Sequence, residues 1–224
     1  MKKAVNTAVS LAEKYGKIYT LGELVHNELV TEYLCKKGAI CLKIEDCDKL
    51  KKGDVALIRA HGITKELEAE LKERGVVLFD ATCPVVKRNQ KLAEDRAKTG
   101  DDVIIVGDKN HDEVIGVASY AGKNCKVVSD GETLPIGEKS TSILFQTTIL
   151  PEKFEKIEKN EIDKKKTEQE ICLYYLGGNL TENRTKTFKR IRKEQNIKTF
   201  YLCFDEEKNP HYKPNTEDYL KGVR

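Results

Sequence analysis

The 224-residue sequence contains no long apolar run, which argues against a membrane protein. No window approaches the roughly 18 apolar residues that a membrane-spanning helix needs. The residues from Met1 to Ala4 lead into no apolar segment of the kind that forms a secretory signal peptide. Hydrophobic residues make up 39% and charged residues 34% of the chain. We therefore expect a soluble, cytoplasmic protein that can bury a core.

The chain also lacks a large excess of one charge and lacks any Cys-x-x-Cys pair. A formal net charge of +3 is too small to indicate nucleic-acid binding, whose usual footprint is a clustered basic face. Without Cys-x-x-Cys pairs, neither a zinc ribbon nor a thioredoxin motif is available. In a chain without a signal peptide, we expect most of the seven cysteines to be reduced, and many to be buried. Cysteines from distant segments could still converge on a cofactor.

Strands and helices alternate along the first 150 residues. Short apolar runs predict strands at 17–21, 39–42, 54–59, 76–79, 103–106, 126–128 and 142–145. Apolar residues at helical spacing predict helices between Ala4 and Gly16 and at 26–36, 64–74 and 87–98. Alternation of this kind is typical of α/β layers with parallel sheets.

Reactive side chains gather at four of the predicted strand ends. These ends are GELVHN at 22–27, RAHG at 59–62, DATCP at 80–84, and the segment 107–113. Ligands of open α/β sheets bind beyond the carboxyl ends of the strands. Three of the four histidines, His26, His61 and His111, lie in these turns. Three histidines at equivalent strand ends indicate a shared polar pocket rather than three unrelated surface residues.

The residue types at these ends suit a small anionic substrate. Histidines can donate hydrogen bonds to phosphate oxygens, and helix N-termini add backbone N–H groups. Thr147 and Thr148 add hydroxyl groups. Glu113 is a candidate proton donor, with a solvated acid at a helix N-terminus as the alternative. Cys83 could be a nucleophile, a metal ligand or a packing residue, and its place beside the histidines favours a ligand.

Taken together, these segments resemble the LytB family of 4-hydroxy-3-methylbut-2-enyl diphosphate reductases. The matching runs stand in family order: GELVHN (22–27), RAHGI (59–63), DATCPVVK (80–87), GDKNHDEVIG (107–116) and QTT (146–148). The resemblance implies a three-lobed, trefoil-like arrangement of small parallel-sheet α/β domains. It also implies reductive dehydration of the substrate to isopentenyl and dimethylallyl diphosphate, a step of non-mevalonate isoprenoid biosynthesis.

The resemblance further implies a role for individual residues. His26, His61 and His111 match the histidines that contact the diphosphate and the hydroxyl group. Thr147 matches a substrate-contacting threonine, and Glu113 matches the acid that delivers a proton.

A central [4Fe-4S] cluster, held by one cysteine from each lobe, is also implied by the resemblance. Cys83 matches the middle ligand and Cys172 the third. An iron with an open site would act as a Lewis acid toward the substrate oxygen. Electrons would come from a donor such as ferredoxin or flavodoxin.

The chain departs from the family pattern at both ends. No cysteine precedes Cys35, so the first cluster ligand is missing, and the family's later Ser-Asn-Ser-type diphosphate clamp is absent. We expect residues 1–83 to form the first lobe without its cysteine segment, 84–170 the second lobe, and 171–224 a partial third lobe. With two matched thiolates, we expect a poorly held cluster and an impaired reductase.

Two other functions compete with the reductase. The first is a non-catalytic paralogue that binds a diphosphate or a protein partner through the histidine pocket. The second is a basic binding module in the lysine-rich tail, at 164–166 and 186–193. Acidic residues are interleaved with these lysines, which favours an ordinary solvated surface there.

Overall fold

The computed structural model describes residues 2–129, 132–137, 140–149, 171–176 and 197–202, and for residues 2–3 and the last two segments it describes the backbone alone. The helices are α1 (Lys2–Tyr15), α2 (Glu28–Lys36), α3 (Lys65–Glu73), α4 (Pro84–Lys98) and α5 (Asp112–Ala121), with short 3-10 helices η1 (Ile44–Lys49) and η2 (Gly122–Asn124). The strands are β1 (Ile18–Leu21), β2 (Ala39–Leu42), β3 (Val55–Ile58), β4 (Val77–Asp80), β5 (Asp102–Val106), β6 (Cys125–Val128), β7 (Thr141–Phe145), β8 (Ile171–Leu176) and β9 (Ile197–Leu202). In these segments, no helix combines the length and the apolar character needed to cross a membrane.

The first sheet is parallel and has the strand order β2-β1-β3-β4. Its central strand β3 is buried along its whole length, because successive side chains enter cores on opposite faces. Val55 and Leu57 join the core formed with α1 and α2, whereas Ala56 and Ile58 join the core formed with η1 and α3. This two-sided burial explains why the run VALI is apolar without alternation.

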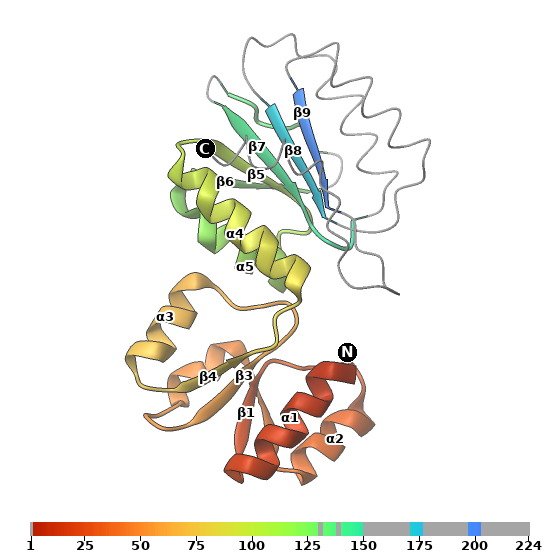
Figure 1. Ribbon diagram of the computed structural model, residues 1–224, viewed down its shortest axis with the longest axis vertical. Helices are drawn as coiled ribbons and strands as arrows, with labels where there is room; N and C mark the ends of the chain where they lie inside the picture. The colour runs from red at the N-terminus through yellow and green to blue at the C-terminus, as the bar shows by residue number, and fades with distance from the viewer. Residues whose placement is uncertain (1, 130–131, 138–139, 150–170, 177–196, 203–224) are drawn as a thin grey trace.

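The second sheet is also parallel, in the order β6-β5-β7-β8-β9. Helices α4 and α5 lie side by side on one face of it (Figure 1). Their apolar residues, Val86, Leu92, Val114 and Val117 among them, pack with Val103, Ile105 and Leu144 of the sheet. At the carboxyl end of β7, Asn89 of α4 donates its side-chain amide N–H to the Phe145 carbonyl at 3.1 Å.

The predicted α/β class with parallel sheets is confirmed. Helix α4 begins at Pro84, three residues before the predicted start, because proline at the first helical position has a suitable fixed φ. Strands β8 and β9 continue the second sheet instead of starting a sheet of their own, β8 pairing with β7 from Thr141 to Leu144. The third lobe, which includes residues outside the described ranges, stays a prediction.

Candidate functional site

The turn after β3 carries His61. Gly62 closes the turn with a φ of +77°, a left-handed conformation that favours glycine, and its N–H donates to the Arg59 carbonyl at 3.0 Å. The His61 side chain is half-buried, and its Nδ1 is a buried atom without a hydrogen-bond partner in the described residues. A buried, unpaired ring nitrogen at a strand end is the kind of atom that a ligand satisfies.

His111 stands at the end of the loop after β5, where it caps helix α5. Its Nδ1 accepts a hydrogen bond from the Glu113 N–H at 3.1 Å. In the neutral ring this places the proton on Nε2, so His111 has a ring N–H left to donate. The loop is tied to the end of β7, because Gln146 Oε1 accepts from the Asp108 N–H at 2.9 Å.

The two histidines meet across the boundary between the lobes. Their ring centroids are 5.1 Å apart, with the ring planes inclined by 47°. The backbone beside His61 is tightly packed at Gly62, where a Cβ would lie 2.6 Å from Gln90 Nε2, whereas a Cβ on Gly116 would lie 3.7 Å from the His61 carbonyl oxygen, an ordinary contact distance. Of the three histidines predicted to share a pocket, the structure brings His61 and His111 together.

Glu113 reaches the same edge from the first turn of α5, but it is not the solvated acid that was considered as an alternative. The residue is 2% exposed. Its carboxylate accepts from the backbone N–H and from the hydroxyl of Thr147, both at 2.7 Å. Glu113 and Thr147, which lie 34 residues apart, therefore form one unit at the carboxyl ends of β5 and β7.

His61 is held in its neutral form. Burial is the largest cause that lowers its pKa from the ordinary value of 6.5, and the electrostatic interactions with Arg59 and His111 lower it further. Asp112 and Glu113 act in the opposite direction without reversing the shift. A neutral imidazole has one donor and one acceptor nitrogen, which suits contact with a phosphate oxygen or a hydroxyl group.

Arg59 is a residue at this edge that the sequence analysis did not single out. It is 8% exposed, and its Nη2 lies 2.5 Å from Asp112 Oδ2, on the far side of the lobe boundary. Its guanidinium also packs against Gly22, where a Cβ would lie 2.8 Å from the Arg59 Cζ. An arginine directly after a fully buried strand was the available signal, because a buried guanidinium needs a partner.

His26 lies apart from the histidine pair. Its side chain is 82% exposed, and its Nδ1 lies 3.0 Å from Glu23 Oε2. No contact described in the structure joins it to His61 or His111. Its predicted role toward a diphosphate stays a prediction.

Cys83 stands at the edge where the histidines meet. It is half-buried and is the capping residue of α4, and its N–H donates to the Ala60 carbonyl at 2.9 Å. Cys83 therefore lies next to the turn of the first lobe that carries His61. The sulfur is free of a capping hydrogen bond, so it remains available to a ligand.

Cys172 is not brought to that edge. It pairs with Ser142 in the β7–β8 register, three residues before β7 ends at Phe145. At about 3.3 Å per residue, the Cys172 backbone lies roughly 10 Å back from the carboxyl edge of the sheet. Across the residues that the structure describes, no group of three or more His, Cys, Asp or Glu side chains could hold a metal ion.

The remaining described cysteines are also unsuited to ligation at this edge. Burial raises the pKa of the Cys47 and Cys125 thiols to about 11. Cys35 and Cys41 are exposed, in α2 and β2 of the first lobe. A thiolate, not a thiol, binds a metal, so the raised pKa disfavours Cys47 and Cys125 as ligands.

The sequence model of the LytB protein family matches residues 1–198. The chain belongs to the LytB family. A family member from Caldanaerobacter subterraneus subsp. tengcongensis, named 4-hydroxy-3-methylbut-2-enyl diphosphate reductase, is 36% identical over 202 residues, covering 88% of this chain and 69% of the relative. A protein of the same name from Thermoanaerobacter sp. is 42% identical over 155 residues, covering 67% of this chain and 54% of the relative.

Two solved structures are similar to this LytB chain. The first is the E-1-hydroxy-2-methyl-but-2-enyl-4-diphosphate reductase from Plasmodium falciparum, with a TM-score of 0.65 and 24% identity, covering 98% of this chain and 75% of that one. The second is (E)-4-hydroxy-3-methyl-but-2-enyl diphosphate reductase, described as the terminal enzyme of the non-mevalonate pathway. It has a TM-score of 0.61 and 29% identity, and it covers 92% of this chain and 84% of that one. The first likeness supports the fold alone.

Proposed function

We propose that this chain is a 4-hydroxy-3-methylbut-2-enyl diphosphate reductase of the non-mevalonate pathway, and that it forms isopentenyl and dimethylallyl diphosphate. The observation that carries the proposal is the constellation of His61, His111, Glu113 and Thr147, which three elements of two lobes bring to one edge. These residues stand in the runs that resemble the family, and the curated relatives carry the reductase name.

The residues divide between holding the anion and delivering a proton. The ring N–H of His111 and the neutral ring of His61 would hold diphosphate oxygens. Breaking the allylic C–O bond and releasing water takes two electrons and two protons for each substrate. Glu113 would deliver one of these protons once it is protonated, since its carboxyl group is buried beside the Thr147 hydroxyl at 2.7 Å. The electrons would come from a donor protein such as ferredoxin or flavodoxin.

The iron–sulfur cluster that the resemblance implies does not fit the described residues. Among the described residues, Cys83 is the one cysteine at the site, and Cys172 lies back along its strand. We therefore assign no step of the reaction to a cluster held by these two cysteines. The proposal includes slow turnover by this chain, because Cys83 is the only one of the two matched cysteines that the structure places at the site.

The alternative is a non-catalytic paralogue that keeps the diphosphate site. The unpaired buried Nδ1 of His61 favours ligand binding in either case. The two functions differ in turnover and in the presence of a cluster. They share the prediction that inorganic pyrophosphate binds at the histidine pair.

The test combines binding and turnover with the same anaerobic preparation. The chain is reconstituted with iron and sulfide, its visible absorbance and iron content are measured, and substrate consumption is followed with a chemical reductant. Slow but measurable product formation supports the reductase. A colourless protein that binds pyrophosphate without turnover supports the paralogue.

Single substitutions identify the binding residues. We expect His61→Asn and His111→Asn each to weaken pyrophosphate binding in calorimetry. The same measurement on His26→Asn tests the third predicted histidine, which the bound anion would have to draw in from its exposed position. Unchanged affinity in all three variants would refute the proposed anion site.

A further inference from the structure

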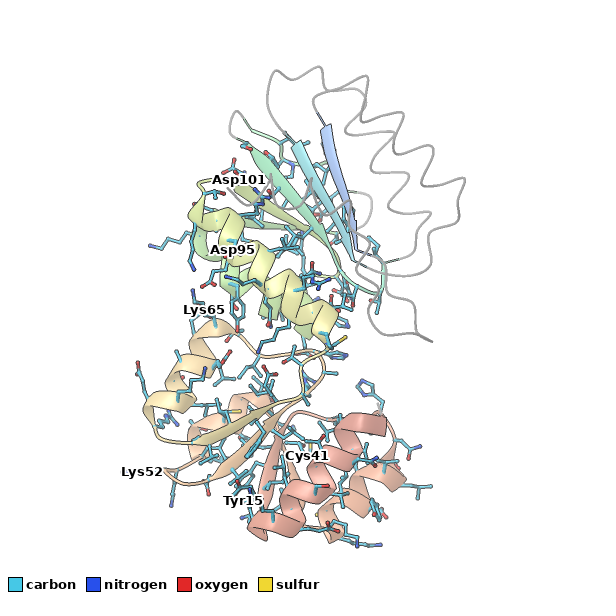
Figure 2. The ribbon with its side chains drawn as sticks, viewed as in Figure 1. Tyr15, Cys41, Lys52, Lys65, Asp95 and Asp101 are labelled. Atoms are coloured by element: carbon cyan, nitrogen blue, oxygen red, sulfur yellow. The ribbon has the colours of Figure 1, made fainter. Side chains whose placement is uncertain are left out.

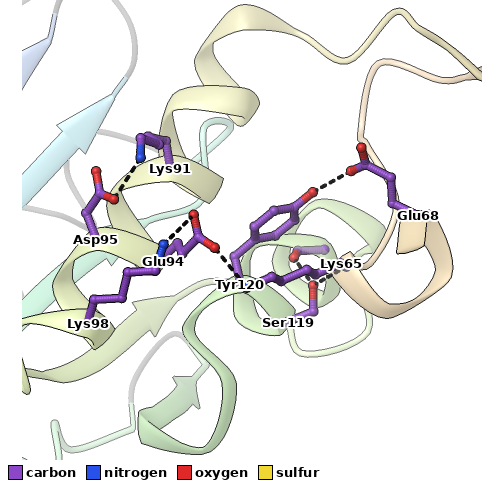
Figure 3. A network of polar contacts seen from close by, with 9 residues as sticks. Lys65, Glu68, Lys91, Glu94, Asp95, Lys98, Ser119 and Tyr120 are labelled. Carbon is purple, nitrogen blue, oxygen red and sulfur yellow. Dashed lines mark hydrogen bonds and ion pairs between the residues drawn. The ribbon is translucent and has the colours of Figure 1, made fainter. Parts of the chain in front are cut away.

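Helix α5 is attached to the first lobe near both of its ends. Near its end, Tyr120 donates its hydroxyl to Glu68 of α3 at 2.8 Å, and Ser119 accepts from the Lys65 N–H at 2.9 Å. Figure 3 shows this outer group of contacts, which continues through Lys65 and Glu94. At the helix start, the Arg59–Asp112 ion pair crosses the same boundary. The start of α5 is also where His111 and Glu113 stand.

The Arg59–Asp112 pair is strongly asymmetric in burial. The Arg59 side chain is 10% exposed and the Asp112 side chain 50%. Gly22 limits the space on another side of the guanidinium, and within the described residues the buried Nε has no hydrogen-bond partner. A planar guanidinium confined in this way has little freedom, so it fixes where Asp112 can lie.

We propose that Arg59 is a positioning residue, which acts through Asp112 to hold His111 against His61 in the geometry that an anionic ligand requires. Asp112 directly follows His111 in the chain, and Arg59 stands two residues before His61. The ion pair thus connects the two histidine-bearing segments, whose rings are 5.1 Å apart. The choice of diphosphate as the ligand rests on the proposed function, whereas the geometry of the two rings does not.

A direct contact between Arg59 and the ligand is the competing explanation. In that case Asp112 would be an inhibitory counter-charge, and removing it would strengthen anion binding. If Arg59 positions the histidines, removing either partner weakens binding, because both losses release the same segment. The two explanations therefore predict opposite effects for Asp112→Asn.

The binding experiment uses the full chain and inorganic pyrophosphate in calorimetry. We expect Arg59→Leu and Asp112→Asn each to weaken binding by about tenfold, which is the effect of losing one well-placed hydrogen bond to the anion. The double variant should be no weaker than the more affected single variant, because the pair acts as a unit. Tyr120→Phe, which removes the outer contact to Glu68, is the matched control and should bind within about twofold of the wild type. Equal or tighter binding by Asp112→Asn would overturn the inference.

The second experiment needs no ligand. With histidine-labelled protein, the nuclear Overhauser effect between the His61 and His111 rings reports their separation directly. We expect this signal in the wild type and in Tyr120→Phe, a loss of it in Asp112→Asn, and partial recovery in Arg59→Lys relative to Arg59→Leu. Where Arg59→Leu does not fold, the half-exposed Asp112 supplies the decisive variant.

The two experiments separate the two proposals. If the wild type fails to bind pyrophosphate, the proposed function loses its anion site, and the ring signal still decides the role of Arg59. A ring signal that survives in Asp112→Asn would overturn the positioning role even if the wild type binds pyrophosphate.

Discussion

Replacing Gly62 by alanine should destabilise the contact between the two lobes, where Gly62 packs against Gln90. The residue has a φ of +77°, and an added Cβ would lie 2.6 Å from Gln90 Nε2. Gln90 is only 4% exposed, so its amide has little room to move away. Gly16 is a matched control, because it has the same φ of +77° with nothing within 4 Å of an added Cβ.

The expected change in the free energy of unfolding is the sum of separate contributions. A left-handed conformation costs about 1–2 kcal/mol for a residue with a Cβ. The smaller conformational freedom of the unfolded alanine chain offsets about 0.4–1 kcal/mol of this. We therefore expect Gly16→Ala to lower the free energy of unfolding by about 1 kcal/mol. The clash with Gln90 adds about 1–3 kcal/mol to Gly62→Ala, as overpacking of a filled site does.

Gly116→Ala should act in the opposite direction. The position is inside α5, and an added Cβ would lie 3.5 Å from the Ile63 carbonyl oxygen, an ordinary contact distance. Alanine is better than glycine in a helix by about 0.5–1 kcal/mol. Urea unfolding of the three variants measures all of these differences. If Gly62→Ala and Gly16→Ala lower the free energy of unfolding equally, or if Gly116→Ala lowers it, the packing described between the lobes is refuted.

Three further predictions concern individual side chains. Glu113→Gln should lower turnover and leave diphosphate affinity largely unchanged, because its amide can still accept one Thr147 hydrogen bond; equal losses in both quantities would assign Glu113 to binding or folding. Cys41 is exposed and should react rapidly with iodoacetamide at neutral pH, whereas Cys47, whose pKa burial raises to about 11, should react only on unfolding. The folded state lowers the pKa of His61 below 6.5, so the unfolded state binds the proton more readily. The stability that His61 contributes is therefore complete above pH 6.5. It is lost as the pH falls from 6.5 toward the lowered pKa. As the pH is lowered through that range, the urea midpoint of unfolding should therefore fall more steeply for the wild type than for His61→Gln. Parallel curves of midpoint against pH would contradict the lowered pKa of His61.

The first sheet could be predicted from the sequence because its signals are local. The run VALI at 55–58 is a short apolar segment between polar residues, and the structure makes it the central strand β3. Thr64 begins the helix predicted at 64–74, and its hydroxyl accepts from the Leu67 N–H at 3.3 Å at the start of α3. Gly16 was predicted to follow the first helix, and α1 does end at Tyr15, directly before this glycine.

Helix α5 was harder to predict because its own sequence favours a helix only weakly. It contains the β-branched residues Val114, Ile115 and Val117 as well as Gly116, all of which lower helix propensity. Its cap is a histidine rather than the usual Ser, Thr, Asp or Asn. Packing of Val114 and Val117 in the core of the second lobe supplies what the local sequence lacks.

The site itself could be predicted only as a set of candidates. The sequence indicated that the strand-end residues share a pocket, and the structure brings the rings of two of them, His61 and His111, to 5.1 Å from each other. It gave no sign that Arg59 pairs with Asp112, because the two stand 53 positions apart and meet only when the lobes dock. The burial of Glu113 depends in the same way on Thr147, which arrives from another strand.

The division of the two histidines between lobes has a consequence for folding. All four strands of the first sheet precede Cys83, so this sheet can form during synthesis before α5 leaves the ribosome. The contact between the two histidine rings arises later, when the two lobes dock. A substitution that hinders docking alone would therefore leave a protein whose circular dichroism looks native and whose histidine rings never meet.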